Sequence, residues 1–172
     1  MKKLIPVFIL TLLLGARAVA QRPYEEFSER PHEKTLKGII SREVLLSDTS
    51  FTWYAENLKG YTPNARALEG LKKNADSLEL LVFMGTWCED SHFVIPKLFA
   101  LLDAAHFPPD KITLIGVDRK KQTLSHLSEA LGVTNVPTIM VMKNGKEQGR
   151  VVEYGKYGVF DMELAEILSR IN

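Results

Sequence analysis

The chain has 172 residues, of which 45% are hydrophobic and 25% charged, a composition typical of one globular domain. Its 22 basic and 21 acidic side chains give a formal net charge of +1. So balanced a charge argues against a nucleic-acid partner and against a polybasic membrane-binding surface.

The first 20 residues have the pattern of a secretory signal peptide. Lys2 and Lys3 precede an apolar run at 4–14, and the segment closes with AVA at 18–20. The alternative is an uncleaved membrane anchor, but the run has 11 residues and spanning a bilayer takes roughly 20. We therefore expect export to the periplasm or extracellular space, cleavage after Ala20, and no stable membrane insertion afterwards. The mature chain would lose three basic residues and no acid, leaving 19 basic and 21 acidic side chains.

The segment before the main domain is expected to fall into two parts. Residues 21–36 are polar, with two prolines and four glutamates, which predicts a flexible lead-in. Residues 37–77 carry apolar residues at helical spacing, which predicts an N-terminal helical elaboration. One of its helices should end at Gly60, and the next should begin at Thr62-Pro63.

Residues 78–172 alternate between strand and helix patterns. The predicted order is a buried strand at 78–85, a helix at about 89–105, a buried strand at 112–118, a helix closed by Gly132, a hairpin turning at Asn144-Gly145, and a last helix from Phe160. A helix between the first two strands implies that they pair in parallel, and the hairpin adds antiparallel strands. The fold class is therefore α/β, with a mixed central sheet and flanking helices. The basic run at 119–121 is expected to be a solvated helix start.

The single cysteine, Cys88, stands between the first predicted strand and its helix, in the stretch TWCEDSHFVIP at 86–96. Unpaired backbone N–H groups and the positive end of the helix dipole favour a thiolate at such a position, and the thiolate is the nucleophile in disulfide exchange. A small buried apolar residue is the alternative interpretation of Cys88. Its placement at a helix start favours a reactive thiol.

Four features of residues 78–172 resemble the thioredoxin family. Trp87-Cys88 stands where that family has its Trp-Cys-x-x-Cys site, and Pro96 lies where it has a helix-kinking proline. Val136-Pro137-Thr138 resembles its cis-proline segment, and 143–145 its hairpin turn. The resemblance implies a cis bond at Val136-Pro137 that presents exposed backbone beside Cys88, where an extended substrate could pair.

Two departures from the family pattern concern the second thiol. Ser91 occupies the resolving position, so no internal disulfide can form. Val82 stands where the resemblance places a buried acid that activates the resolving thiol. These two losses are consistent with each other, and the Ser91 hydroxyl remains able to donate a hydrogen bond to the Cys88 thiolate.

Three further residues are candidates for tuning the sulfur. Glu89 and Asp90 place negative charge near Cys88 and oppose the helix end, although carboxylates are also ordinary residues in a first helical turn. His92, four residues after Cys88, is expected to be solvent-exposed and to assist the thiol at times. We expect no metal, because no second Cys or His pair lies nearby, and no cofactor.

Three functions remain open on the sequence. The first is a monothiol exchanger, in which Cys88 and Ser91 form the catalytic pair, Trp87, Val136 and Pro137 bind substrate, and the partners are protein or small-molecule thiols and disulfides. The second is a redox-inactive binding module for extended peptides. The third is a thiol sensor or peroxide scavenger acting through sulfenic acid. The Trp-Cys and Val-Pro elements favour the first.

Overall fold

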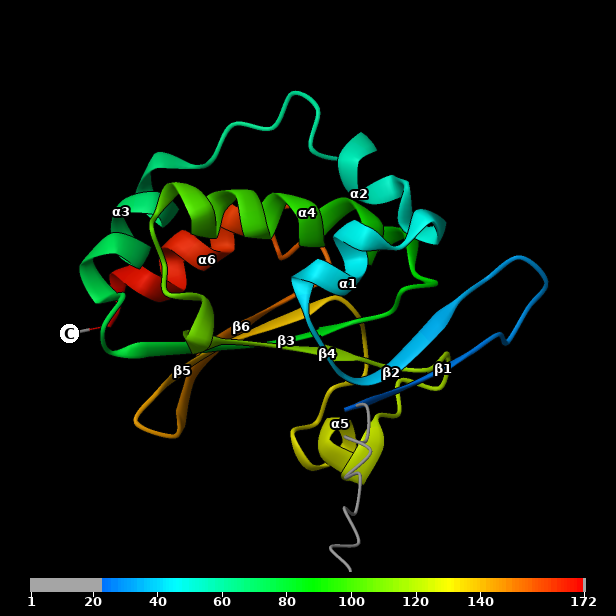
Figure 1. Ribbon diagram of the computed structural model, residues 1–172. Helices are drawn as coiled ribbons and strands as arrows, with labels where there is room; N and C mark the ends of the chain where they lie inside the picture. Colours follow the sequence, from blue (N-terminus) through cyan, green and yellow to red (C-terminus); the bar gives the residue numbers. More distant parts are fainter. Residues whose placement is uncertain (1–22, 172) are drawn as a thin grey trace, which may run out of the picture.

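The computed structural model describes residues 23–171 and shows one sheet with helices on both faces (Figure 1). Six strands of the described chain form this sheet in the order β1-β2-β4-β3-β5-β6. The strands are β1 Tyr24–Phe27, β2 Thr35–Ile40, β3 Leu78–Met84, β4 Ile112–Gly116, β5 Thr138–Lys143 and β6 Lys146–Val152. The predicted signal peptide at 1–20 lies outside the described residues and stays a prediction.

The strand pairing confirms the predicted mixed sheet. β3 and β4 are parallel, with Val82 opposite Leu114, and the crossover between them contains the long helix. β5 pairs antiparallel with β3 on one side and with β6 on the other, and Asn144-Gly145 make the hairpin turn. The central strand β3 therefore has a neighbour on each side and ends at the turn that carries Cys88.

The helices divide unequally between the two faces. They are α1 Arg42–Ser47, α2 Trp53–Glu56, α3 Ala65–Asn74, α4 Glu89–Ala104, α5 Leu127–Ala130 and α6 Phe160–Ser169, with short 3-10 helices at Thr49–Phe51, Pro109–Lys111 and Leu124–His126. Figure 1 shows α1 to α4 and α6 over one face and α5 below the other. Within residues 23–171 no helix is both long and apolar enough to cross a membrane.

Alternate side chains of β3 enter two different cores. Leu80, Val82 and Met84 point into the large cluster beneath α3, α4 and α6, whereas Phe83 points into a smaller cluster on the α5 side. Such alternation follows from the two-residue period of a strand. The smaller cluster also contains Val136 and is bordered by Trp87 and Cys88. The candidate site thus rests on the edge of the smaller core.

The expectation of a flexible lead-in over 21–36 is wrong for its described part. β1 and the start of β2 fall there and extend the sheet, with Tyr24 opposite Gly38 and Gly38 opposite Gly116. Glycine at 116 is required by this close approach, because a Cβ there would lie 2.2 Å from the Leu36 carbonyl oxygen. An edge strand needs few apolar side chains, so a polar composition did not reveal it.

The predicted elaboration at 37–77 is not wholly helical, because it begins inside β2. In addition, two predicted helices are shorter than their apolar patterns indicate. The first helix before Gly60 is reduced to the 3-10 turn at Thr49–Phe51 and α2. The helix closed by Gly132 is broken into a 3-10 turn and α5, because Ser125 and His126 both have a left-handed backbone, with φ values of 58° and 55°. Residues other than glycine seldom adopt this conformation, so apolar spacing alone did not predict it.

Candidate active site around Cys88

Cys88 is the N-cap residue of α4 and directly follows the turn at the end of β3. Its amide donates to the Gly85 carbonyl at 3.0 Å, and its own carbonyl accepts from the His92 amide at 2.9 Å, which starts the helix. The side chain is partly buried, and its sulfur makes no capping hydrogen bond to α4. The sulfur therefore lies at the positive end of a 16-residue helix with access to solvent.

The Val136-Pro137 bond is cis, which confirms the prediction, and it places a backbone oxygen beside the sulfur. The Cys88 Sγ–H donates to the Val136 carbonyl oxygen at 3.3 Å. Val136 and Pro137 are both buried, in contrast to the exposed backbone that we expected. The Pro137 carbonyl also accepts from the Glu153 amide at 2.7 Å. The Val136 carbonyl oxygen is thus the part of this segment that contacts the sulfur.

Ser91 is fully buried and makes its hydrogen bond away from the thiol. Its Oγ accepts from the Gly85 amide at 3.2 Å, which joins α4 to the end of β3. The expected hydrogen bond from Ser91 to Cys88 is not made in the described chain. Val82 is also fully buried, within the large apolar cluster. Neither residue carries a group that could exchange a proton with the Cys88 thiol near neutral pH.

Trp87 folds back over the turn and carries two cations on its ring. Its Nε1 donates to the Val117 carbonyl at 2.9 Å, and the Arg119 guanidinium and Lys121 ammonium lie 4.8 and 5.6 Å from its ring centroid. Glycine at 85 leaves room for the indole, since a Cβ there would lie 2.7 Å from the ring. Trp87 therefore brings positive charge to the rim of the site.

Arg119 was not recognised as a site residue from the sequence, because the run 119–121 was interpreted as a helix start. It lies instead in a loop after β4, where its guanidinium pairs with Glu33 and its amide donates to Glu29 at 2.9 Å. The Glu33 hydrogen bond raises the pKa of Arg119, and the Cys88 thiolate charge adds a smaller increase. The only sequence signal was the basic run itself.

Tyr154, which the sequence analysis also missed, lies just after β6. Burial raises the pKa of Tyr154 to about 12, and the nearby Asp90 carboxylate and the charges of Cys88 and Glu89 act in the same direction. Asp90 is half-buried, whereas Glu89 is exposed. Of the two candidate tuning acids, Asp90 therefore acts on the Tyr154 hydroxyl more strongly than Glu89 does.

His92 is half-buried, in contrast to the exposed position that we expected. Its ring stacks on Trp53 of α2 with centroids 4.2 Å apart, and its Nε2 lies 2.8 Å from the Thr86 carbonyl oxygen. A carbonyl accepts only, so Nε2 carries a proton and donates. His92 therefore fixes the residue before Trp87, and its described contacts are with Thr86 and Trp53 rather than with the sulfur.

Within residues 23–171 no group of three or more His, Cys, Asp or Glu side chains is placed to hold a metal ion. The site instead combines a thiol at a helix start, a cis-proline carbonyl, an indole and a guanidinium. Together with the mixed sheet, this arrangement defines a domain of the thioredoxin type.

Comparison with known proteins agrees with this class. The Thioredoxin family model matches residues 65–162, which is more than half of the chain. A thioredoxin of Echinococcus granulosus is 32% identical over 96 residues, covering 56% of this chain and 83% of that relative. A thioredoxin of Chlamydia muridarum (strain MoPn / Nigg) is 33% identical over 78 residues, covering 45% and 71%. The structure of thioredoxin O2 from Arabidopsis thaliana in the oxidized state aligns with a TM-score of 0.39 and 22% identity, covering 61% and 83%.

The chain belongs to the thioredoxin family. Membership indicates, in general terms, thiol–disulfide redox chemistry with protein thiols or disulfides as substrates.

The first testable prediction concerns the protonation of His92. Burial lowers the pKa of His92, against smaller opposing effects of the Thr86 hydrogen bond and the charges of Glu89 and Glu33. The folded chain thus favours the neutral ring. This contribution to stability is complete above the unfolded pKa of about 6.5 and is lost as the pH falls through that value towards the lower folded pKa. Urea unfolding at about pH 7.5 and about pH 5.5 should show a smaller loss of stability in His92→Gln than in the unmodified chain.

His126→Gln is the matched control, because the His126 side chain is 90% exposed. This variant should keep the full pH dependence of the unmodified chain. An unchanged pH dependence in His92→Gln would show that the ring is not held neutral by its packing on Trp53.

Proposed function

We propose that this protein is an exported monothiol thiol–disulfide exchanger in which Cys88 is the single nucleophile. The observation that carries the proposal is the position of the Cys88 sulfur, partly exposed at the start of α4 and 3.3 Å from the Val136 carbonyl oxygen. A cysteine with only a packing role has no need of a helix start, a neighbouring guanidinium or access to solvent.

The exchange has two steps. The Cys88 thiolate attacks one sulfur of a substrate disulfide, forming a new S–S bond, and the other substrate sulfur leaves with the electron pair and takes a proton. A second thiol then attacks the substrate sulfur of this mixed disulfide and releases Cys88 as a thiolate. If that thiol belongs to the same substrate, the disulfide is isomerised. An external thiol reductant instead attacks the Cys88 sulfur, which releases the substrate as a thiol, and a second reductant thiol then frees Cys88 and leaves the reductant as a disulfide.

The electrostatic surroundings of the sulfur are mixed. The α4 N-terminus and the Arg119 guanidinium favour negative charge on Cys88, whereas Asp90 and Glu89 in the first turn oppose it. The neutral thiol gains a hydrogen bond to the Val136 carbonyl, which the thiolate gives up. Substrate backbone that donates to this carbonyl would replace the bond and leave the sulfur free to react.

One observation supports the alternative of a redox-inactive module that binds extended peptides. Ser91 uses its hydroxyl to join α4 to Gly85, so the second position of the motif has a structural role that needs no redox chemistry. In that case Trp87, Val136 and Pro137 would hold a peptide without covalent attack. The two functions differ in whether Cys88 forms mixed disulfides.

The second testable prediction is that Cys88 forms such species. Incubation of the mature chain with an unfolded, disulfide-bonded protein should give a covalent adduct that dithiothreitol removes, seen by non-reducing electrophoresis and intact mass. Cys88→Ser should give none. An Arg119→Gln variant should form the adduct more slowly, by about two- to fivefold, because it removes a positive charge near the thiolate. Failure of the unmodified chain to form any adduct would favour the binding module.

The third prediction restores the second thiol with Ser91→Cys. Residue 91 lies one turn beyond Cys88, which brings the two sulfurs within bonding reach, so mild oxidation should remove two hydrogens by mass. The reduced variant should lose about 1 kcal/mol of stability, because a thiol is a weaker acceptor than a hydroxyl for the Gly85 amide. Turnover as a reductase with a dithiol donor should appear, and Val82→Asp should raise it further, at a cost in stability from burying a carboxylate.

Ser169→Cys is the control for this experiment, since it adds a thiol at the end of α6, far along the chain from Cys88. It should give only intermolecular products under the same oxidant. If Ser91→Cys behaves in the same way, residue 91 does not face the sulfur.

The fourth prediction concerns export. Because the signal-peptide pattern ends at Ala20, the mature protein should begin at Gln21. Intact-mass measurement of protein purified from the cell envelope or the medium checks this. A chain that retains Met1 in a soluble cell extract would contradict both the cleavage and the proposed compartment.

A further inference from the structure

A pocket of about 710 Å³ is lined in part by α4, the helix that Cys88 caps, and no sequence pattern predicted it. It is bordered by α4, by the loop that leads into α3, and by the loop that leads into α6. We call it the α4 pocket. The residues that matter to its chemistry are Tyr61, Phe93, Lys97, Tyr154, Val159 and Asp161.

Tyr154 relates the α4 pocket to the surroundings of Cys88. Tyr154 lines the pocket, and its ring packs against that of Phe93 with centroids 5.4 Å apart. The charges of Asp90 and Cys88 both raise the pKa of the Tyr154 hydroxyl. Tyr154 is thus the residue of the pocket that is electrostatically coupled to the sulfur.

Lys97 gives the pocket an ammonium group whose hydrogen-bonding capacity is partly unused. The side chain is 8% exposed, its Nζ donates to the Phe93 carbonyl at 3.0 Å, and it lies 3.1 Å from the Phe93 ring centroid. Lys97 makes no salt bridge within residues 23–171, and burial lowers its pKa. An ammonium has three N–H donors; one goes to the Phe93 carbonyl and the Phe93 ring covers a second, which leaves one for a ligand.

One oxygen of a second buried polar group, Asp161, lacks a hydrogen-bond partner among the described residues. Asp161 is 2% exposed, and its Oδ2 accepts from the Tyr61 hydroxyl at 2.8 Å and from the Asn64 amide at 3.0 Å. Its Oδ1 has no hydrogen-bond partner among the described residues. Buried polar atoms without partners are uncommon and call for an explanation such as a missing ligand.

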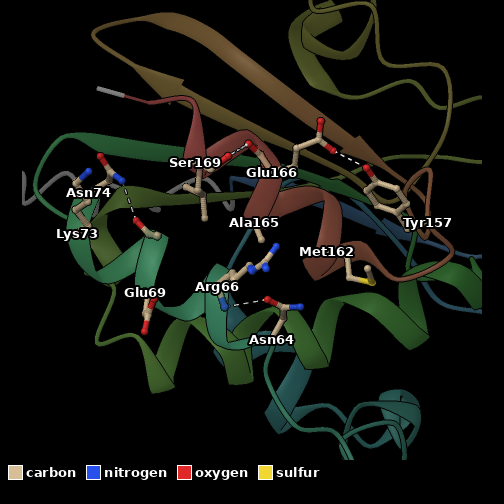
Figure 2. Close-up of a pocket in the computed structure, with 12 residues that line it drawn as sticks. Asn64, Arg66, Glu69, Lys73, Asn74, Tyr157, Met162, Ala165, Glu166 and Ser169 are labelled. Atoms are coloured by element: carbon tan, nitrogen blue, oxygen red, sulfur yellow. Dashed lines mark hydrogen bonds between the residues drawn. The ribbon is translucent and has the colours of Figure 1, made fainter.

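The groove between α3 and α6, of about 500 Å³, offers no such combination (Figure 2). Glu166 on its wall accepts a hydrogen bond from Tyr157 and forms ion pairs with Lys156 and Arg170. Asn64 at its other end caps α3 by accepting from the Arg66 amide. The Glu166 carboxylate of that groove is thus already paired from within the chain.

The rim of the α4 pocket is apolar and exposed. Phe93, Val159 and Met162 are 42%, 46% and 45% exposed, although each is large and hydrophobic. Such a rim around an unused N–H donor suits a ligand with an apolar body and a hydrogen-bond acceptor. A polypeptide in extended conformation has both, because each residue offers a side chain and a backbone carbonyl.

We propose that the α4 pocket is a substrate subsite that receives an apolar side chain of an extended polypeptide, whose backbone carbonyl accepts a hydrogen bond from Lys97. The inference rests on the proposed function in one respect, namely that the polypeptide is the one whose cysteine meets Cys88. It assigns the substrate class: polypeptides with a large apolar residue near the cysteine, rather than small disulfides alone.

The experiment separates binding from exchange by using the full-length mature chain with Cys88→Ser. Fluorescein-labelled decapeptides carry Ser in place of the reacting cysteine and one Leu placed two, three, four or five residues from it on either side. A matched set replaces Leu with Ser. Fluorescence anisotropy measures the dissociation constants. At one spacing the Leu peptide should bind about tenfold more tightly than its Ser counterpart, because the pocket removes the side chain from water.

Two further substitutions assign this preference to the α4 pocket. Phe93→Ala removes part of the apolar rim, and Lys97→Met removes the N–H donors while keeping a chain of similar volume. Each should reduce the Leu preference or the affinity about fivefold. Leu46→Ala is the matched control, because Leu46 is 57% exposed on α1 and does not line the pocket, and it should bind as the parent does.

The outcomes distinguish the pocket from the exchange reaction. Absence of a Leu preference at every spacing, or a preference that both pocket variants retain, overturns the subsite. The reaction is tested separately with Cys88 intact and bis(2-hydroxyethyl) disulfide, which is too small to span the site and the pocket. A Leu preference together with no mixed disulfide on Cys88 would keep the subsite and refute the exchanger.

Discussion

Hydrogen bonds from three directions meet at Thr86, and the geometry of the site depends on them. The Thr86 hydroxyl accepts from the Leu36 amide at 3.1 Å and donates to the Lys34 carbonyl at 2.8 Å, while its backbone carbonyl accepts from His92 at 2.8 Å. The residue is 4% exposed, so these bonds are shielded from water. Because Trp87 and Cys88 follow directly, the position of the sulfur is set jointly by β2, by α4 and, through the stacking of His92 on Trp53, by α2.

This arrangement gives the N-terminal segment a role in the site. β1 and β2 extend the sheet, and the loop between them supplies Glu33, which fixes the Arg119 guanidinium over the Trp87 ring. The loop between α2 and α3 closes one wall of the α4 pocket. The segment before β3 therefore positions the Arg119 charge near the thiol and forms part of the α4 pocket, while residues 78–171 supply the thiol and Arg119 themselves.

The sequence predicted the parts of this structure that depend on local patterns. A run such as 78–85 can only be a buried element, Asn144-Gly145 can hardly be other than a hairpin turn, and Cys88 stands where a strand pattern gives way to a helix pattern. The cis bond at Val136-Pro137 followed from the family resemblance and is confirmed. Contacts between distant residues did not follow: Arg119 over Trp87, His92 on Trp53 and Tyr154 beside Asp90 each join segments whose relative placement only the fold determines.

The pairing of β2 with β4 also sets an order of assembly. Gly38 lies opposite Gly116, so the first described strands of the chain cannot complete the sheet until synthesis has passed β4. During translation or translocation, β1 and β2 emerge first and can pair only with each other until β4 has emerged, whereas β3, α4 and β4 are consecutive in the chain and can pack together as soon as each has emerged. Because Leu36 and Lys34 of this segment hold Thr86, the turn that carries Cys88 gains these hydrogen bonds only when β2 is in its place beside β4. A chain interrupted before Gly116 would carry its thiol on an unsupported turn.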